Sequence, residues 1–234
     1  MPLTKTDIAI NHIARDVVSE KIQAGSLLKS ENELALSIGV SRTSIRSALQ
    51  TLSNKGLINI VPKVGSLANA AEQWNWLDQD VLRWVTKLLP MDTFLPHLLQ
   101  IRLMIEPKAA ALAASHAAGQ DLANLERAYE DMALGLREND RVRINSGDMA
   151  FHKSILAATK NPFLISLGDT LTTTMAVSFS NTLEKNLQLS QPALQAHFVV
   201  LDAIRMRNAE LARETMQDIV LSAANKLGHS LQAS

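Results

Sequence analysis

The sequence predicts a mainly α protein of two domains. The first is a small N-terminal domain of three helices and one two-stranded hairpin, and the second is an all-α bundle of six to seven helices. Leucine, alanine and methionine, which favour helices, dominate the 47% of residues that are apolar. The length of 234 residues suffices for two domains. After residue 68 no further β-branched run between turn residues occurs, so strands are expected only near the N-terminus.

Composition and charge exclude several classes of protein. There is no cysteine, and therefore no disulfide framework or thiolate chemistry. No signal peptide opens the chain and no apolar run reaches the roughly 18 residues of a membrane helix, so we expect a cytoplasmic protein without a membrane partner. The net charge is zero, but residues 1–70 carry eight Lys/Arg and five Asp/Glu, which gives +3 there and −3 in the rest. This asymmetry is typical of a nucleic-acid-binding domain attached to an acidic body.

The first expected helix covers residues 6–23, and Ala24-Gly25 ends it. Its apolar residues recur at helical spacing and form one buried face, made of Ile10, Ile13, Ala14, Val17, Val18 and Ile22.

Two short helices joined by a tight turn follow between residues 30 and 54. Ser30 is placed to cap the first helix and Glu33, three residues on, to complete a capping box. Gly39 permits the sharp turn, and Ser41 caps the second helix. The buried side of that second helix consists of Ile45, Ala48, Leu49 and Leu52, and its outer side presents Arg42, Thr43, Ser44, Arg46 and Gln50.

A short hairpin follows these helices. Residues 57–61 (LINIV) read as a strand, residues 62–65 as a turn and residues 66–68 as the returning strand. Two helices followed by such a wing describe a winged helix-turn-helix, whose second helix enters the major groove of DNA. We therefore predict a DNA-binding domain over residues 1–70 with contacts from Ser41, Arg42, Thr43, Ser44, Arg46, Lys63 and Gly65. The alternative for the helix pair alone is an ordinary hairpin with solvated charges.

Residues 71–90 are expected to form a linker and the first helix of the body. Three tryptophans occur between residues 74 and 84. We expect Trp74 and Trp76 to pack the linker against the body as a clamp between domains, with a ligand cage as the alternative.

Residues 91–234 are expected to form the all-helical second domain, which binds an effector and dimerises. The periodicity predicts helices at about 77–88, 92–118, 121–138, 141–159, 161–186, 191–207 and 209–231.

Four ionisable residues fall on apolar stripes of these helices: Arg102, Asp148, His152 and His197. Each has an ordinary explanation. Arg102 can pair with Glu106 one turn on, Asp148 with His152 on their shared face, and His197 can be a satisfied core residue. Together they favour a pocket, because a buried charge needs a partner, which here is another member of the set, a metal or an anionic ligand.

The motifs resemble the GntR superfamily of bacterial regulators, in the branch with an FCD (FadR C-terminal) effector domain. The resemblance rests on GSLLKSENELA (25–35), GVSRTSIRSAL (39–49), GLI (56–58) and the wing glycine, Gly65. Lys29 stands where most members have proline. In the family, the residues matching Arg42, Thr43, Arg46 and Gly65 contact DNA.

The C-terminal resemblance rests on Arg102 with Glu106, on D-x-x-F-H at 148–152, and on His197 followed by LDAI. In metal-binding members an Asp, the His four residues on and two later His bind a divalent ion. The last of these corresponds to Ile219, which cannot be a ligand. Asp148, His152 and His197 with a water or effector oxygen remain able to hold Zn²⁺. Without a metal, the two His would bond directly to the effector.

The W-N-W-L-D-x-D-V-L-x-W linker resembles the sugar-acid-responsive branch, which implies a small hydroxy acid such as galactonate. Arg102 would then take its carboxylate, and Asp148, His152 and His197 its hydroxyls. Weaker candidates at neighbouring inward positions are Ser178, Asn181, Thr182 and Lys226.

The resulting expectation is a homodimeric transcriptional repressor that binds a palindromic operator and is released by the acid. Two alternatives stay open at this point. One is a metal-dependent hydrolase or lyase that acts on a sugar acid through Asp148, His152 and His197. The other is a structural nucleoid protein without an effector.

Overall fold

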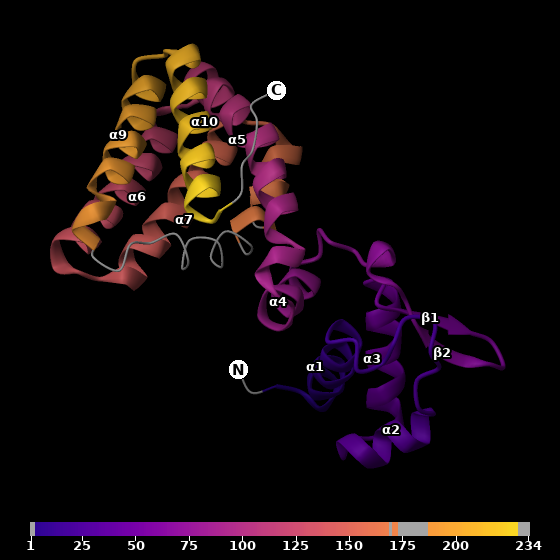
Figure 1. Cartoon of the computed structure of the whole chain (residues 1–234). Coiled ribbons are helices and arrows are strands. Elements are labelled where there is room, and N and C mark those ends of the chain that lie inside the picture. The colour runs from indigo at the N-terminus through magenta and orange to yellow at the C-terminus, as the bar shows by residue number, and fades with distance from the viewer. Residues whose placement is uncertain (1–2, 169, 173–186, 229–234) are drawn as a thin grey trace. The chain divides into compact units, whose positions relative to one another are not determined.

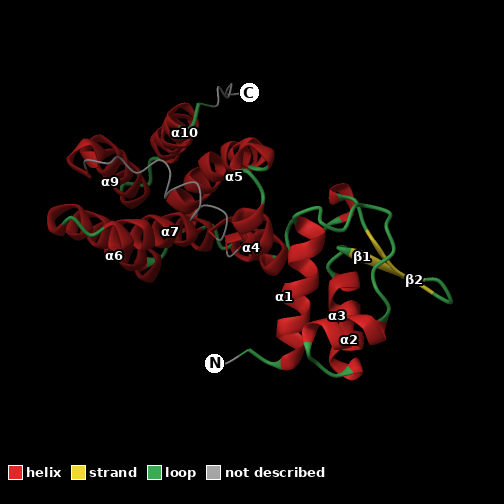
Figure 2. Cartoon of the chain, turned by 60° about the horizontal axis from the view of Figure 1, so that its bottom comes forward, coloured by secondary structure: helices red, strands yellow, loops and turns green. Residues whose placement is uncertain are grey.

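The computed structural model describes residues 3–168, 170–172 and 187–228, and the chain divides into two compact units, Met1–Pro90 and Met91–Ser234 (Figure 1). The predicted fold class is confirmed. One β-hairpin lies in the first unit, and helices make up the other regular elements of the described residues (Figure 2). None of the described helices combines the length and apolar character that crossing a bilayer requires.

The N-terminal unit has the winged helix-turn-helix order of elements. These are α1 (Lys5–Val18), α2 (Glu31–Ile38), α3 (Arg42–Asn54), β1 (Ile58–Val61) and β2 (Gly65–Ala68). The strands are antiparallel, with Ile58 opposite Ala68 and Val61 opposite Gly65. The apolar faces of α1 and α3 form the core of this unit, in which Ile13, Ile45 and Leu52 are almost completely buried.

Local capping explains where the two short helices begin and end. The amide of Ser30 donates to Glu33 Oε2 at 2.9 Å and Ser30 Oγ accepts from the Glu33 amide at 3.3 Å, so the predicted capping box is present. Gly39 ends α2 in the left-handed conformation (φ 73°). Ser41 Oγ then accepts from the amide of Ser44 at 3.1 Å and starts α3. The predicted turn at Gly39 and the predicted caps at Ser30 and Ser41 are thereby confirmed.

The first helix is shorter than predicted, because it ends at Val18 rather than near residue 23. Ser19 Oγ donates back to the carbonyl of Arg15, and Glu20 adopts a left-handed conformation (φ 57°) that turns the chain out of the helix. The amide of Ile22 bonds to the carbonyl of Asp16 in the resulting turn. A positive φ at a glutamate is not encoded in the apolar period, which is why the prediction overran.

Residues 71–90 lie with the winged domain and not with the bundle. They form a short 3-10 turn (Ala71–Gln73) and α4 (Gln79–Leu88), and α4 packs on α1. Trp84 Nε1 of α4 donates to Asn11 Oδ1 of α1 at 2.9 Å. The prediction that this segment begins the body therefore differs from the observed division.

The two linker tryptophans stack on each other within the N-terminal unit, with ring centroids 5.9 Å apart. Their ring nitrogens donate to the carbonyls of Asn69 and Ala71 in the same unit. Gly56 lets the linker approach closely, because a Cβ there would lie 2.3 Å from the carbonyl oxygen of Gln73. The tryptophans thus fix the linker to the winged domain. The predicted packing of these residues against the body is not observed in the described contacts.

The second unit is a helical bundle. It contains a 3-10 turn (Met91–Thr93), α5 (Leu95–His116), α6 (Gly119–Glu138), α7 (Arg141–Ala158), a helix over 162–168 and 170–172, a 3-10 turn (Leu187–Ser190), α9 (Gln191–Arg205) and α10 (Ala209–Lys226). These bounds lie close to the predicted ones. The second half of the helix predicted at 161–186 falls outside the described residues.

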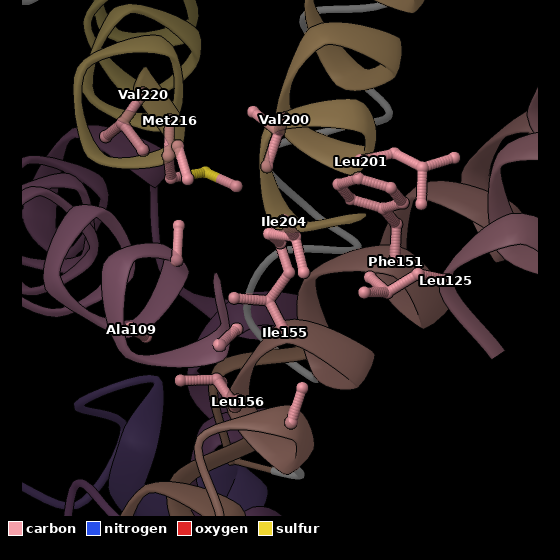
Figure 3. Close-up of a cluster of buried hydrophobic side chains, with 14 of the residues drawn as sticks. Ala109, Leu125, Phe151, Ile155, Leu156, Val200, Leu201, Ile204, Met216 and Val220 are labelled. Carbon is pink, nitrogen blue, oxygen red and sulfur yellow. The ribbon is translucent and has the colours of Figure 1, made fainter. Parts of the chain in front are cut away.

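The core of the bundle contains side chains of α5, α6, α7, α9, α10 and the helix that includes Leu171, and Figure 3 shows part of it. Phe151 of α7 lies near Leu125 of α6, Ile155 of α7 lies near Ile204 of α9, and Met216 of α10 belongs to the same cluster. Alanines of α5 let neighbouring helices come near, and four of them, Ala109, Ala110, Ala113 and Ala114, are completely buried. This packing fixes the faces of α5, α7 and α9 that carry the polar residues described below.

Candidate effector pocket and DNA-reading surface

The outer face of α3 is a polar surface at the start of that helix. Arg42, Thr43 and Arg46 are exposed, while Ile45 and Leu49 on the opposite face are buried. The side chains that the sequence predicts for DNA contact are therefore accessible at the end of α3 that enters a groove in docked helix-turn-helix proteins.

Arg46 is held in position by α2. Its Nε and Nη2 lie 3.3 and 3.1 Å from the two carboxylate oxygens of Glu31, a bidentate pair between the two helices of the motif. The Arg46 side chain is nevertheless 72% exposed. Sequence reasoning missed Glu31, because its partner lies fifteen residues away and no period links them.

The wing tip presents a second cation. Lys63 is exposed and adopts a left-handed conformation (φ 64°) in the turn between β1 and β2. Gly65, at φ 132°, has a conformation that favours glycine, and a Cβ there would lie 3.1 Å from Leu27 Cδ1. The geometry of the wing itself thus requires this glycine.

A buried polar cluster lies in the bundle, formed by Arg102 and Glu106 of α5, Asp148 and His152 of α7, and His197 of α9. Each of these five residues is at most 4% exposed. Four of them, Arg102, Asp148, His152 and His197, are predicted from their positions on apolar stripes, and the structure brings all four together. Glu106 enters the prediction only as a possible partner of Arg102.

Distances within the cluster divide it into two parts. Arg102 Nε and Nη2 lie 2.7 and 3.3 Å from the Glu106 carboxylate oxygens, and His152 Nδ1 lies 2.8 Å from Glu106 Oε2. On the other side, Asp148 Oδ1 lies 3.0 Å from His197 Nε2 and 3.7 Å from His152 Nε2. Glu106 thus connects Arg102 to the first histidine, and Asp148 lies between the two imidazoles.

These short distances are not all hydrogen bonds. Among the described side chains, Asp148 Oδ2, His152 Nδ1 and His197 Nε2 are buried without a hydrogen-bond partner of adequate geometry. His197 Nδ1 lies 2.7 Å from the carbonyl of Ala193, so this nitrogen is the donor and Nε2 carries a lone pair. A lone pair 3.0 Å from a carboxylate oxygen is repulsive unless a cation or a proton lies between them.

Electrostatics in the cluster favour ionised carboxylates. Burial raises the pKa of Glu106, but Arg102 and His152 outweigh it and lower the pKa to about 2. Burial likewise opposes ionisation of Asp148, yet His152 and His197 hold its pKa well below the usual range. Burial lowers the pKa of His152, whereas Glu106 and Asp148 raise it to about 9. A proton on His152 is therefore what balances the two carboxylates when no other cation is present.

The same atoms fit a divalent metal. One ligand atom each from Asp148, His152 and His197 lies within 4.8 Å of the others. Two imidazoles and one carboxylate are a donor set suited to zinc and similar ions, with a position left open. His197 and His152 each have a carbonyl or carboxylate next to the other ring nitrogen, the usual arrangement of metal-ligating histidines.

The remaining effector candidates differ in their surroundings. Arg102 belongs to the cluster but is paired with Glu106, as in the alternative left open above. Lys226 lies exposed in the last turn of α10, so its predicted inward position is wrong. Ile219 packs partly buried against the core. Ser178, Asn181 and Thr182 lie outside the described residues.

Comparison with known families matches both units. Residues 6–67 match the model described as bacterial regulatory proteins, gntR family, and residues 97–222 match the FCD domain. The chain belongs to the GntR family of bacterial regulators, in the branch with an FCD domain. The FCD match covers more than half of the chain and contains the whole polar cluster.

Characterised relatives are transcriptional regulators rather than enzymes. This GntR regulator is 30% identical over 227 residues to the galactonate operon transcriptional repressor of Escherichia coli K12, a match that covers 97% of this chain and 98% of the relative. It is 27% identical over 195 residues to the repressor NanR of Salmonella newport, covering 82% and 74%. These relatives disfavour the enzyme alternative.

Solved structures show the same fold. The structure of Lar, which controls the expression of the Listeria monocytogenes agr system, matches with a TM-score of 0.67 at 17% identity and covers 97% of both chains. Streptococcus agalactiae GntR matches with a TM-score of 0.54 at 20% identity, covering 94% of this chain and 99% of that one.

Proposed function

We propose that this GntR regulator is a homodimeric repressor whose bundle binds a small hydroxy or sugar acid, such as galactonate, together with a divalent metal, and which then leaves a palindromic operator. The proposal that the bundle binds an effector and a metal rests on the convergence of Asp148, His152 and His197. Each of these residues has a buried side-chain atom that lacks a hydrogen-bond partner within the described structure. The 30% identity to a galactonate operon repressor supports the class of acid.

The operator is read by the exposed face of α3 and by the wing. Arg42 and Arg46 reach phosphates and base edges, and Ser41, Thr43 and Ser44 add hydroxyl contacts at the start of the helix. The Lys63 side chain and the main chain at Gly65 contact the DNA sugar-phosphate backbone beside the adjacent groove. A dimer related by a two-fold axis places two such surfaces on two half-sites, which is why the operator is palindromic.

Effector binding follows from the charge of the cluster. Without a metal, the charges of Arg102, protonated His152, Glu106 and Asp148 sum to zero, so the cluster has no net attraction for an acid. A divalent cation held by Asp148, His152 and His197 would replace the His152 proton, bring the sum to +1 and supply open positions for carboxylate oxygens. Arg102 donates to Glu106, and a Glu106 carboxylate oxygen lies 2.8 Å from His152 Nδ1.

Release from DNA requires that the acid bind one arrangement of the dimer better than another. The test is a gel-shift titration of the full-length protein on its own upstream region, with galactonate and Zn²⁺ added singly and together. The expected result is release only when both are present. A thermal-shift assay of the same samples should show stabilisation of about 2.7 kcal/mol at 100 times the dissociation constant.

Two variants make this test specific. Asp148→Asn with His197→Gln should abolish the response to galactonate and leave operator affinity unchanged. His116→Gln is the matched control, because His116 is an exposed histidine of the same bundle. A galactonate response that persists in the double variant would refute the pocket. Loss of operator binding in both the double variant and the His116→Gln control would show damage to the fold instead.

A further inference from the structure

One buried polar atom on α7, the helix that carries Asp148 and His152, is not accounted for by the proposed site. Asn145 of α7 is half-buried, and its Oδ1 atom is completely buried without a hydrogen-bond partner in the described part of the chain. Buried amide oxygens normally accept a hydrogen bond, because an unmade one costs free energy. Asn145 therefore marks a place where a donor is expected from outside the described residues.

Asn145 lies on the same face of α7 as the proposed metal ligands. It precedes Asp148 by three residues and His152 by seven, so that the three side chains follow one another along successive turns of one stripe. Gly147 faces elsewhere, since a Cβ there would meet the backbone of Ala128 and Met132 on α6. The polar stripe thus begins one turn before the cluster.

Two arginines among the described residues of α5 and α7 are already paired. Arg102 donates to Glu106, and Arg143, two residues before Asn145, donates to Asp131 and Glu138. Asp148 Oδ2, one turn along the stripe, is likewise a buried oxygen without a hydrogen-bond partner in the described residues. Two such oxygens on successive turns suit a ligand that brings hydroxyl groups.

We propose that Asn145 accepts a hydrogen bond from a hydroxyl group of the effector and selects hydroxy acids over acids without hydroxyls. This inference rests on the proposed effector function and extends it from the carboxylate end of the ligand to its carbon chain. Such selection is strong where a site is built to bond a hydroxyl, because the analogue that lacks it leaves the protein atom unpaired.

The test compares galactonate with hexanoate, which has the same number of carbons and no hydroxyl. Binding is measured by calorimetry on the Zn²⁺-loaded full-length protein. In the wild type, galactonate should bind more tightly than hexanoate. In Asn145→Leu, galactonate affinity should fall roughly 10- to 100-fold with little change for hexanoate, so that the ratio between the acids narrows. Ser146→Ala is the matched control, on the exposed face of the same helix.

Zinc affinity of Asn145→Leu, measured by chelator competition, separates this role from that of a metal ligand. It should stay within about twofold of the wild type, and a loss above tenfold would reassign Asn145 to the metal. Asn145→Ala replaces the leucine variant if circular dichroism shows unfolding. Unchanged galactonate binding in the variant overturns the inference alone, whereas a wild type that binds no sugar acid overturns the proposed function and the inference with it.

Discussion

Removing the Arg102 guanidinium should expose how strongly the polar cluster depends on charge pairing. The variant Arg102→Met keeps most of the apolar stem and removes one of the two groups that hold the pKa of Glu106 near 2. Glu106 is only 2% exposed, so water cannot replace the lost partner. The perturbation therefore leaves a buried carboxylate with a single cationic neighbour, His152.

The magnitude follows from the contacts that are lost. Two charge-assisted hydrogen bonds, at 2.7 and 3.3 Å, disappear. Breaking a buried ion pair from one side costs about 3–5 kcal/mol, and because His152 lies 2.8 Å from Glu106 we expect the lower end, about 3 kcal/mol. The double variant Arg102→Met with Glu106→Gln removes both charges and should recover to within about 1–2 kcal/mol of the wild type.

The assay uses the distribution of tryptophan. All three tryptophans lie between residues 74 and 84 in the N-terminal unit, so their fluorescence reports that unit. Circular dichroism at 222 nm reports helices of both units. In urea, Arg102→Met should lower the midpoint of the dichroism transition of the bundle by about 1–1.5 M and leave the fluorescence transition in place.

Two outcomes would refute this reasoning. A double variant as unstable as the single one would mean that the loss comes from packing and not from the isolated Glu106 charge. A single variant as stable as the wild type would mean that the pair contributes nothing to folding. Glu126→Gln serves as a control, because it breaks the exposed pair with Arg205, which should contribute little to stability.

Three further changes test other parts of the molecule. Arg46→Ala should weaken specific operator binding about 10- to 100-fold in a gel-shift titration, and equal affinity would remove Arg46 from the reading surface. Burial raises the pKa of Asp78, but Lys55 and the amide of Val81 lower it more, so its contribution to stability is present above pH 4 and is lost as the pH falls through the lowered pKa. Fluorescence-detected unfolding at pH 6 and pH 3 should show a smaller acid loss in Asp78→Asn than in the wild type, and identical losses would contradict the pairing. Arg207→Ala removes two hydrogen bonds to the last carbonyls of α5 and should cost about 1–3 kcal/mol by dichroism, which an unchanged midpoint would disprove.

Local signals were sufficient to predict the helix-turn-helix from the sequence. Ser30, Gly39 and Ser41 act through neighbours within four residues, so their caps and turns follow from chain chemistry alone. The end of α1 did not follow, because it depends on Glu20 in a left-handed conformation that few glutamates adopt.

Tertiary partners limited the prediction of the site. The stripe positions of Asp148, His152 and His197 predict burial and hence convergence, as observed. The pairing of Arg46 with Glu31 joins two helices and leaves no trace in a period. The attachment of the tryptophan linker depends on Lys55 and Gly56, which follow the predicted second helix and contact the linker in the fold.

This attachment determines where the chain can be cut. Lys55 Nζ lies 2.8–2.9 Å from carboxylate oxygens of Asp78 and Asp80, and Trp84 is bonded to Asn11, so the segment through Leu88 is part of the winged unit. A chimera that joins this winged domain to a foreign effector domain should therefore have its junction at Pro90. A junction at Ala70 would leave the docking surface for Trp74 bare on the transplanted head, and such a hybrid should aggregate whatever sensor it carries.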